Sequence, residues 1–299
     1  MHKPVLLKET IEYLNPQGGD TILDATIGSG GHAEIIMQKI GRTGTFVGID
    51  QDMMMIDRLN SKYQITNNKF ILVNENFRNL DKVLDSLKIE KIDGVIFDLG
   101  MSTMQLEESG RGFSFQRNES LVMNYKSNLE SSDLTAQDIL NKWSEKDIAD
   151  ILYKYGEERY SRKIAKRIIE TRERKEIKNT FDLVEIIRLS VPPAYRNNRK
   201  INCCTRTFQA LRIAVNDELD TLEEGLEKAW GFLSSNARMA VISFHSLEDR
   251  IVKNFIRSKK EKDEGIILTK KPIRPQEEEI KINPASRSAK LRAVEKNNL

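Results

Sequence analysis

The stretch Asp24-Ala25-Thr26-Ile27-Gly28-Ser29-Gly30-Gly31-His32 decides the fold, because it closes a predicted strand and opens a predicted helix. A β-prone apolar run at residues 21–23 precedes it, and apolar residues recur at helical spacing over residues 33–40. Glycine is favoured in such a turn because a side chain would block close approach of the backbone to a ligand. The stretch therefore predicts a loop that holds a nucleotide-type cofactor.

The alternation of strand and helix continues beyond this loop. Helical patterns separate further apolar strands, which are predicted at residues 45–50, 69–73 and 92–98. This order predicts an α/β fold with a parallel, doubly wound sheet, in which ligands bind beyond the carboxyl ends of the strands. We expect one crevice at those ends to collect Gly28, Asp50, Phe77 and Asp98.

Two cofactors are compatible with the glycine loop. Gly28-x-Gly30-x-x-Ala33, followed by Asp50 at the end of the next strand, satisfies the fingerprint of dinucleotide binding and so admits NAD. Asp24 lies just before the glycines, where it can face the ammonium of S-adenosylmethionine (SAM) but would repel a pyrophosphate. The acid favours SAM, and NAD remains the alternative.

The alternation stops after the fourth strand, and a helical block follows. Residues 131–190 show helical patterns only, a long helix is predicted over residues 207–232, and a buried strand follows at 238–244. The block therefore interrupts the α/β domain. We predict a discontinuous cofactor domain of residues 1–115 and 207–299, and an inserted helical domain of residues 116–206.

Composition is typical of a globular protein of the cytoplasm, with 299 residues of which 39% are hydrophobic and 31% charged. No apolar run approaches the roughly 18 residues that would span a membrane, and the N-terminus lacks a signal core. The two cysteines, Cys203 and Cys204, are adjacent, and the three histidines are scattered along the chain. No ligand spacing predicts a metal.

The net charge of +3 is too small to indicate nucleic-acid binding, but its distribution is uneven. Between Lys154 and Lys178 basic residues outnumber acidic ones two to one, and the tail from Lys281 to Lys296 is also basic. A solvated helix face and an RNA contact both fit such runs.

Several motifs occur in the order found in one family: the glycine stretch, Asp98-Leu99-Gly100-Met101-Ser102, Arg111-Gly112-Phe113-Ser114-Phe115, Thr205-Arg206-Thr207-Phe208, Ser243-Phe244-His245-Ser246 and Ser288-Ala289-Lys290-Leu291-Arg292. With them the chain resembles the RsmH/MraW family of 16S rRNA cytosine N4-methyltransferases. The resemblance implies a Rossmann-like class I SAM-dependent methyltransferase with an inserted all-helical domain. It also implies SAM as donor and, as acceptor, a cytidine in the decoding region of 16S rRNA within the small ribosomal subunit.

The resemblance assigns cofactor contacts to Gly30, Gly31, His32, Asp50, Phe77, Asp98 and Gln105. Asp50 is placed to accept hydrogen bonds from ribose hydroxyls, and Phe77 to lie against the adenine. Asp98 is the candidate catalytic residue, as the acceptor that binds the cytosine amino group. A role for Asp98 as a SAM ligand alone is the competing assignment.

RNA contacts require cations and stacking groups, and suitable residue types lie in these motifs. Phe113 and Phe115 could stack on bases or form a hydrophobic lid. The candidate RNA-binding residues are Arg111, Arg117, Arg206, Arg212, His245, Arg287, Lys290 and Arg292.

The chain departs from the family pattern at residues 121–126, at Ser102-Thr103-Met104 and at Cys203-Cys204, all on the expected acceptor side. These departures keep two alternatives open: a divergent paralogue that methylates another RNA, and a non-catalytic ribosome-assembly factor that binds SAM. The sequence does not fix the oligomeric state, and a homodimer stays open.

Overall fold

The computed structural model describes residues 4–63, 69–197 and 201–298. The chain divides into two compact units. We call them the sheet unit, Met1–Gly100 with Leu219–Leu299, and the helical unit, Met101–Glu218. The inserted segment is thus longer at both ends than the predicted 116–206, because residues 101–115 and 207–218 pack with the helices.

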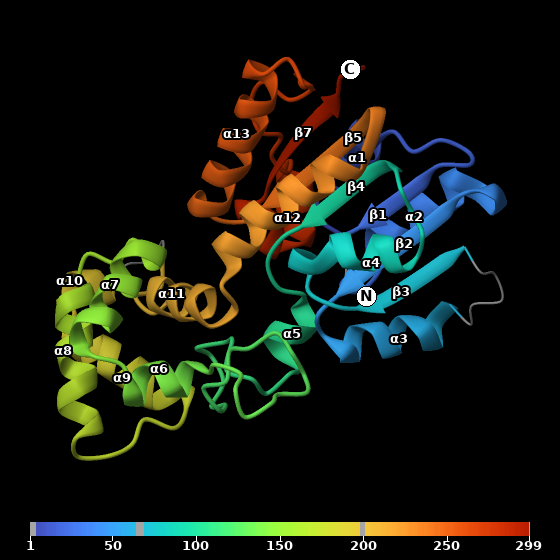
Figure 1. Cartoon of the computed structure of the whole chain (residues 1–299). Helices are drawn as coiled ribbons and strands as arrows, with labels where there is room; N and C mark the ends of the chain where they lie inside the picture. The colour runs from blue at the N-terminus through green and yellow to red at the C-terminus, as the bar shows by residue number, and fades with distance from the viewer. Residues whose placement is uncertain (1–3, 64–68, 198–200, 299) are drawn as a thin grey trace. The chain divides into compact units, whose positions relative to one another are not determined.

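The sheet unit is built on a seven-stranded sheet of order β3-β2-β1-β4-β5-β7-β6 (Figure 1). The first five strands in this order run parallel, whereas β7 is antiparallel to β5 and to β6. The predicted parallel strands are confirmed, and β6 and β7 were not predicted. The strands are β1 Thr21–Asp24, β2 Thr45–Asp50, β3 Phe70–Asn74, β4 Ile92–Asp98, β5 Leu233–Ser243, β6 Gly265–Ile267 and β7 Lys290–Lys296.

Helices cover both faces of this sheet because successive strand side chains point to opposite sides. Ile22 and Ile96 pack with α1 (Leu7–Leu14), α2 (Gly31–Ile40) and α3 (Met53–Tyr63). Leu23 and Phe97, the next residues in the same strands, pack on the opposite side. The helices there are α4 (Leu80–Ser86), α12 (Glu218–Phe232) and α13 (Ser246–Glu261). Short elements complete the unit: η1 Gly41–Thr43, η2 Phe77–Asn79, α14 Glu277–Ile282 and η3 Pro284–Ser288.

The order of the strands reverses between β1 and β4. β1 pairs with β2 on one side and with β4 on the other, so the connections from β1 and β4 leave in opposite directions. Such a switch point opens a crevice at the carboxyl ends of the two strands. The predicted Rossmann-like arrangement is present, and its switch point lies next to the glycine stretch.

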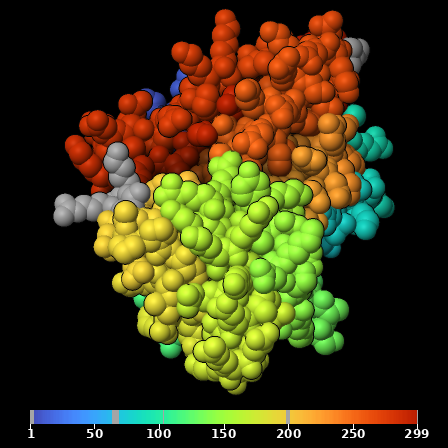
Figure 2. Space-filling model, turned by 90° about the vertical axis from the view of Figure 1, so that its left-hand side faces the viewer, coloured from blue at the N-terminus to red at the C-terminus, as the bar shows by residue number. Residues whose placement is uncertain are grey.

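The helical unit has its own apolar core, which gathers residues from Phe113 to Val215. Residues near the middle of the chain, lime to yellow in Figure 2, form the face of this unit seen there. Its helices are α5 Thr103–Glu107, α6 Ala136–Lys142, α7 Glu145–Gly156, α8 Ser161–Arg172, α9 Thr180–Ser190, α10 Pro193–Arg196 and α11 Thr205–Asn216. Within the described part of the chain, no helix is both long and apolar enough to cross a membrane.

The prediction of a single long helix over residues 207–232 is wrong, because two helices occupy this range. α11 ends at Asn216, and Asp217 adopts a left-handed conformation with φ 48° and ψ 44° before α12 begins. The Asn216 side chain binds backbone groups of a neighbouring segment, accepting from the Tyr125 amide at 2.8 Å and donating to the Met123 carbonyl at 2.7 Å. An apolar stripe does not reveal such a break, because helical spacing continues almost unchanged across one residue.

Candidate active site

The turn after β1 is held to the end of β2 by a carboxylate. The backbone amide of Gly28 donates to Asp50 Oδ2 at 2.9 Å, and the amide of Asp52 donates to Asp50 Oδ1 at 2.8 Å. Asp50 therefore fixes the glycine turn against the neighbouring strand. Its predicted contact with ribose hydroxyls needs acceptor capacity beyond these two bonds, and a carboxylate has further lone pairs to offer.

Two glycines of the turn are required by the protein itself. Gly30 has φ 78°, in the left-handed region, and a Cβ there would stand 2.8 Å from Leu59 Cδ2. A Cβ on Gly31 would stand 2.9 Å from Pro4 Cβ. Close approach of a ligand is therefore not the only reason for glycine at these positions. The backbone conformation of Gly30 and the packing around both residues already exclude side chains. Cofactor contact by Gly30 and Gly31 stays a prediction.

His32 lies at the start of α2 and is 4% exposed. Its Nε2 is 3.1 Å from the Val5 carbonyl oxygen, and its Nδ1 is 3.6 Å from Asp98 Oδ2. Since a carbonyl only accepts hydrogen bonds, the first contact places a proton on Nε2. A proton must then lie between Nδ1 and Oδ2, on either the imidazole or the carboxyl group, for the second contact to be attractive.

Asp98 ends β4 with one carboxyl oxygen unused. Its backbone amide donates to Thr26 Oγ1 at 2.6 Å, which fixes the end of the strand to the glycine stretch. Oδ1 is buried and has no hydrogen-bond partner among the described residues, although 24% of the side chain is exposed. Burial, with the charges of Asp24 and Glu248, raises the pKa of Asp98 well above its ordinary value.

Asp24 is the second acid of this crevice and is 2% exposed. Burial raises the pKa of Asp24 to about 7, helped by the charge of Asp50 and opposed by the hydrogen bond from the Thr26 amide. Two acids that resist ionisation side by side would both be stabilised in their charged form by a cation. Two buried carboxyl groups at this place therefore fit a cationic ligand such as SAM, and contact of Asp24 with its ammonium group stays a prediction.

Phe77 begins η2 beside β4. Its ring meets Phe97 edge to face with centroids 5.6 Å apart. It also rests on the backbone of α12, where a Cβ on Gly225 would stand 2.6 Å from Phe77 Cδ2. Gly225 was missed in the sequence, where a lone glycine inside a predicted helix was its only signal. The lack of a side chain at Gly225 lets the Phe77 ring approach the helix closely.

Gln105 belongs to the helical unit and caps α5. Its Oε1 accepts from the Ser102 amide at 3.0 Å, while its own amide donates to Ser102 Oγ at 3.1 Å. This reciprocal pair is a capping box. Ser102, the last residue of the Asp98–Ser102 motif, thus caps the start of a helix, and the contact of Gln105 with a cofactor stays a prediction.

Most candidate RNA-binding cations of the sheet unit have acidic partners. Lys290 Nζ lies 2.9 Å from Asp249 Oδ2, and Arg292 Nε lies 2.7 Å from Asp249 Oδ1. His245 caps α13, accepting on Nδ1 from the Glu248 amide at 3.3 Å. Arg287 is the exposed member of this group. Lys290, Arg292 and His245 therefore fasten α13 to the sheet and to its own first turn.

The candidates of the helical unit are also engaged in the fold. Arg212 makes a two-point contact with Glu218 at 2.7 and 2.8 Å, with both side chains under 14% exposed. Arg111 donates to the carbonyls of residues 124 and 125. Arg206 donates to the Glu157 carbonyl at 3.2 Å, and the exposed Arg117 donates to the Glu107 carbonyl. These hydrogen bonds give each arginine a role in the fold, and contact of these residues with RNA stays a prediction.

A Rossmann-like sheet with a glycine turn at its switch point, an acid at the end of β2 and two buried carboxyl groups is the arrangement expected of a SAM-dependent methyltransferase. Comparison with known proteins specifies the type. A model of the MraW methylase family matches residues 1–297, so the chain belongs to that family.

The chain is also similar to curated proteins named ribosomal RNA small subunit methyltransferase H. The one from Sulfurihydrogenibium sp. (strain YO3AOP1) is 47% identical over 291 residues, covering 97% of each chain. The one from Caldicellulosiruptor saccharolyticus is 45% identical over 310 residues, covering 99% of each. The one from Thermotoga neapolitana is 45% identical over 296 residues, covering 98% of this chain and 95% of the other.

Proposed function

We propose that this protein transfers a methyl group from SAM to the exocyclic N4 of a cytidine in the decoding region of 16S rRNA. Membership of the MraW methylase family and identities of 45–47% to proteins named ribosomal RNA small subunit methyltransferase H support an rRNA substrate. The assembled small subunit in the cytoplasm is the proposed setting, and SAM is the only cofactor required.

The observation that carries this proposal is Asp98 Oδ1 at the carboxyl end of β4, which has no hydrogen-bond partner in the part of the chain that the structure describes. The N4 lone pair of cytosine is delocalised into the ring, which makes the nitrogen a poor nucleophile. An acceptor that binds an N4 hydrogen favours a pyramidal nitrogen with a localised lone pair. Asp98 Oδ1 supplies that acceptor in a buried position, where such a hydrogen bond is strong.

His32 keeps Oδ1 available for this role. A proton held between His32 Nδ1 and Asp98 Oδ2 leaves a lone pair on Oδ1, whichever of the two groups carries it. The N4 lone pair forms the bond to the methyl carbon, and the electron pair of the broken bond stays on sulfur. The amino nitrogen is cationic after transfer and gives up one proton to water, so that no strong base is required.

The helical unit supplies the surface that we assign to RNA. Along α8 the basic residues Arg162, Lys163 and Lys166 are exposed, and Lys154, Arg159 and Lys175 continue the exposed basic stretch on either side. Phosphates are recognised by such clusters of cations. The sheet unit then binds the donor and the reacting base.

The alternatives suggested by the departures at residues 121–126 are not favoured. Leu121, Met123 and Tyr125 are buried in the core of the helical unit, and Lys126 pairs with Asp133 at 2.7 Å. Apolar side chains at these positions therefore have a packing role within the unit. Nothing in this segment removes the Asp98 carboxyl group or the cofactor crevice.

The test is transfer of labelled methyl from SAM to small ribosomal subunits that lack the modification, followed by nucleoside analysis. We expect N4-methylcytidine with the wild-type protein and a loss of at least about 100-fold in kcat for Asp98→Asn. Asp93→Asn, at the other end of β4, is the matched control and should retain activity. Transfer at the wild-type rate by Asp98→Asn would remove Asp98 from the chemistry.

A further inference from the structure

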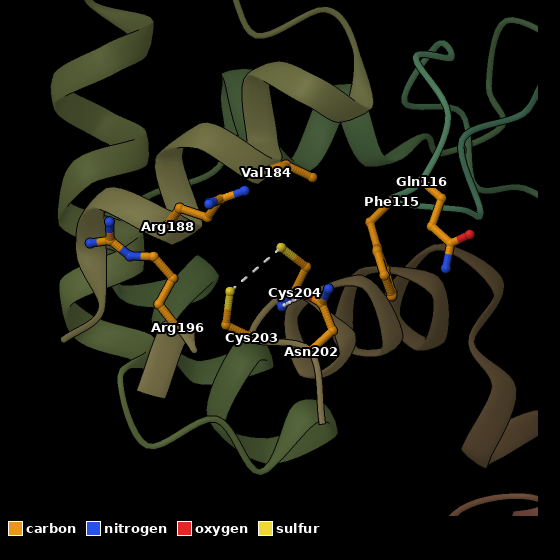
Figure 3. A pocket seen from close by; sticks show the side chains of 8 residues that line it. All are labelled: Phe115, Gln116, Val184, Arg188, Arg196, Asn202, Cys203 and Cys204. Carbon is orange, nitrogen blue, oxygen red and sulfur yellow. Dashed lines mark hydrogen bonds between the residues drawn. The ribbon is translucent and has the colours of Figure 1, made fainter. Parts of the chain in front are cut away.

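The helical unit contains a cavity of about 240 Å³ that the proposed methyl transfer does not use (Figure 3). Its walls come from the segment before α6, from α9 and α10, and from the residues just before α11. The residues that line it are Phe115, Gln116, Val184, Arg188, Arg196, Asn202, Cys203 and Cys204.

The charge of this cavity is positive. Arg188 and Arg196 are its two cations, and the described residues that line it include no carboxylate. Burial raises the pKa of the Cys204 thiol, so this thiol stays protonated and brings no negative charge. Two guanidinium groups without a counterion in the same cavity favour an anionic ligand.

Arg196 has unused hydrogen-bonding capacity. Its Nε is buried without a partner among the described residues, and only its Nη2 reaches a carbonyl, that of Val191 at 3.4 Å. In Figure 3 the Arg188 guanidinium extends into the space between Val184 and Cys204, while that of Arg196 lies at the edge. Both are forked donors of the kind that match phosphate oxygens.

An aromatic ring and two amides complete the lining. Phe115 is half-buried and meets Phe208 edge to face, with ring centroids 5.6 Å apart and planes at 82°. An edge-to-face neighbour leaves the ring a face against which a planar base can stack. The exposed side chains of Gln116 and Asn202 carry amide groups able to bind base edges.

Thiol chemistry is a poorer explanation of the site. Cys203 Sγ and Cys204 Sγ lie 4.0 Å apart, and both residues are buried. A buried protonated thiol is a weak nucleophile and a weak metal ligand. The two cysteines, which depart from the family pattern, therefore contribute small uncharged side chains to the lining of the cavity.

We propose that this cavity binds one unstacked nucleotide of single-stranded RNA, with its base on Phe115 and its phosphate on Arg188 and Arg196. The inference rests on the proposed function, which makes RNA the substrate. The volume of about 240 Å³ lies below the roughly 300–1,000 Å³ of pockets for drug-sized ligands, so the cavity has room for no more than one nucleotide. The cavity is thus a second point of RNA attachment, in addition to the reacting cytidine.

The test measures binding of a labelled single-stranded RNA fragment of the decoding region to the full chain by fluorescence anisotropy. Phe115→Leu should weaken binding roughly five- to 150-fold through lost stacking. Arg188→Gln combined with Arg196→Gln should lower the slope of log affinity against log salt by about 0.7, the value for one phosphate contact on a single strand. Arg257→Gln is the control, an exposed arginine of the sheet unit paired with Glu261.

The outcomes separate this inference from the proposed function. Each variant is first checked for a wild-type melting curve and wild-type SAM affinity. If the wild-type protein methylates subunits but the cavity variants bind RNA as tightly and with the same salt slope, the cavity inference is wrong. If the variants lose binding of cytidine monophosphate alone and keep RNA binding, the cavity is a free-nucleotide site and the inference is likewise overturned. Failure of the wild-type protein to methylate any subunit would instead refute the proposed function.

Discussion

Replacing Asp24 by asparagine should stabilise the protein without cofactor, by an amount that grows as the pH rises from about 4 to about 7. The carboxyl group is buried, and its pKa is raised from 3.8 to about 7. The folded protein therefore holds a proton that the unfolded chain releases between these values. The contribution of Asp24 to the free energy of unfolding falls as the pH rises from about 4 to about 7 and is then constant, because in that interval the folded state holds this proton more tightly than the unfolded state.

The size of the effect follows from the shift. A change from 3.8 to about 7 is about three pKa units, which at 1.36 kcal/mol for each unit is an upper limit of about 4 kcal/mol above pH 7. The amide side chain introduced by Asp24→Asn would keep an oxygen to accept from the Thr26 amide, which lies 3.1 Å from Asp24 Oδ1. The variant therefore avoids the cost of ionising a buried group and retains the hydrogen bond.

Thermal unfolding without SAM, measured for wild type and Asp24→Asn from pH 4.5 to 8.5, tests this reasoning. The difference in melting temperature should grow with pH up to about 7, toward roughly 2–4 °C per kcal/mol. Asp93→Asn, an exposed acid of the same unit, should show no such growth. A difference between variant and wild type that is equal at pH 5 and pH 8 would refute the buried-acid argument.

Three other substitutions test single contacts. Gly30→Val should lower the melting temperature even without SAM. The left-handed backbone conformation costs a residue other than glycine about 1–2 kcal/mol, and the new side chain would clash with Leu59. Loss of SAM affinity with an unchanged melting temperature would contradict this. Gly225→Ala should displace Phe77 and raise KM for SAM, whereas Gly231→Ala in the same helix, where a Cβ meets nothing within 4 Å, should not. Arg212→Ala should lower the free energy of unfolding in urea by about 3 kcal/mol, because the buried Glu218 carboxylate loses its cation. Wild-type stability of this variant would instead favour an RNA-binding role for Arg212.

The strands that build the crevice could be predicted because each is a continuous apolar run bounded by turn residues. β1 and β4 are buried on both faces, which leaves no ambiguity of period. β6 and β7 were missed for the opposite reason. β7 alternates buried residues such as Leu291 with charged ones such as Arg292, and β6 has only three residues. A basic tail therefore concealed a strand that pairs with β5.

The candidate site also has features that the sequence predicts and features that it does not. The acids at strand ends could be placed in one crevice from sequence, since parallel strands bring their carboxyl ends together. Contacts between distant segments could not. Neither the Val5 carbonyl that fixes His32 nor the packing of Phe77 on Gly225 leaves a local pattern in the sequence. Both depend on which surfaces the fold brings together.

The motif cations illustrate why family resemblance alone does not identify RNA contacts. Lys290 and Arg292 share one carboxylate, Asp249, whose pKa is lowered by their charges and hydrogen bonds against the opposing effect of burial. If either cation moved away to bind a phosphate, the partly buried Asp249 carboxylate would lose one of its two ion pairs. A motif residue can thus be required because it joins α13 to β7. The exposed basic residues of α8 face no such cost, since exposed ion pairs contribute little, so RNA binding is better sought there.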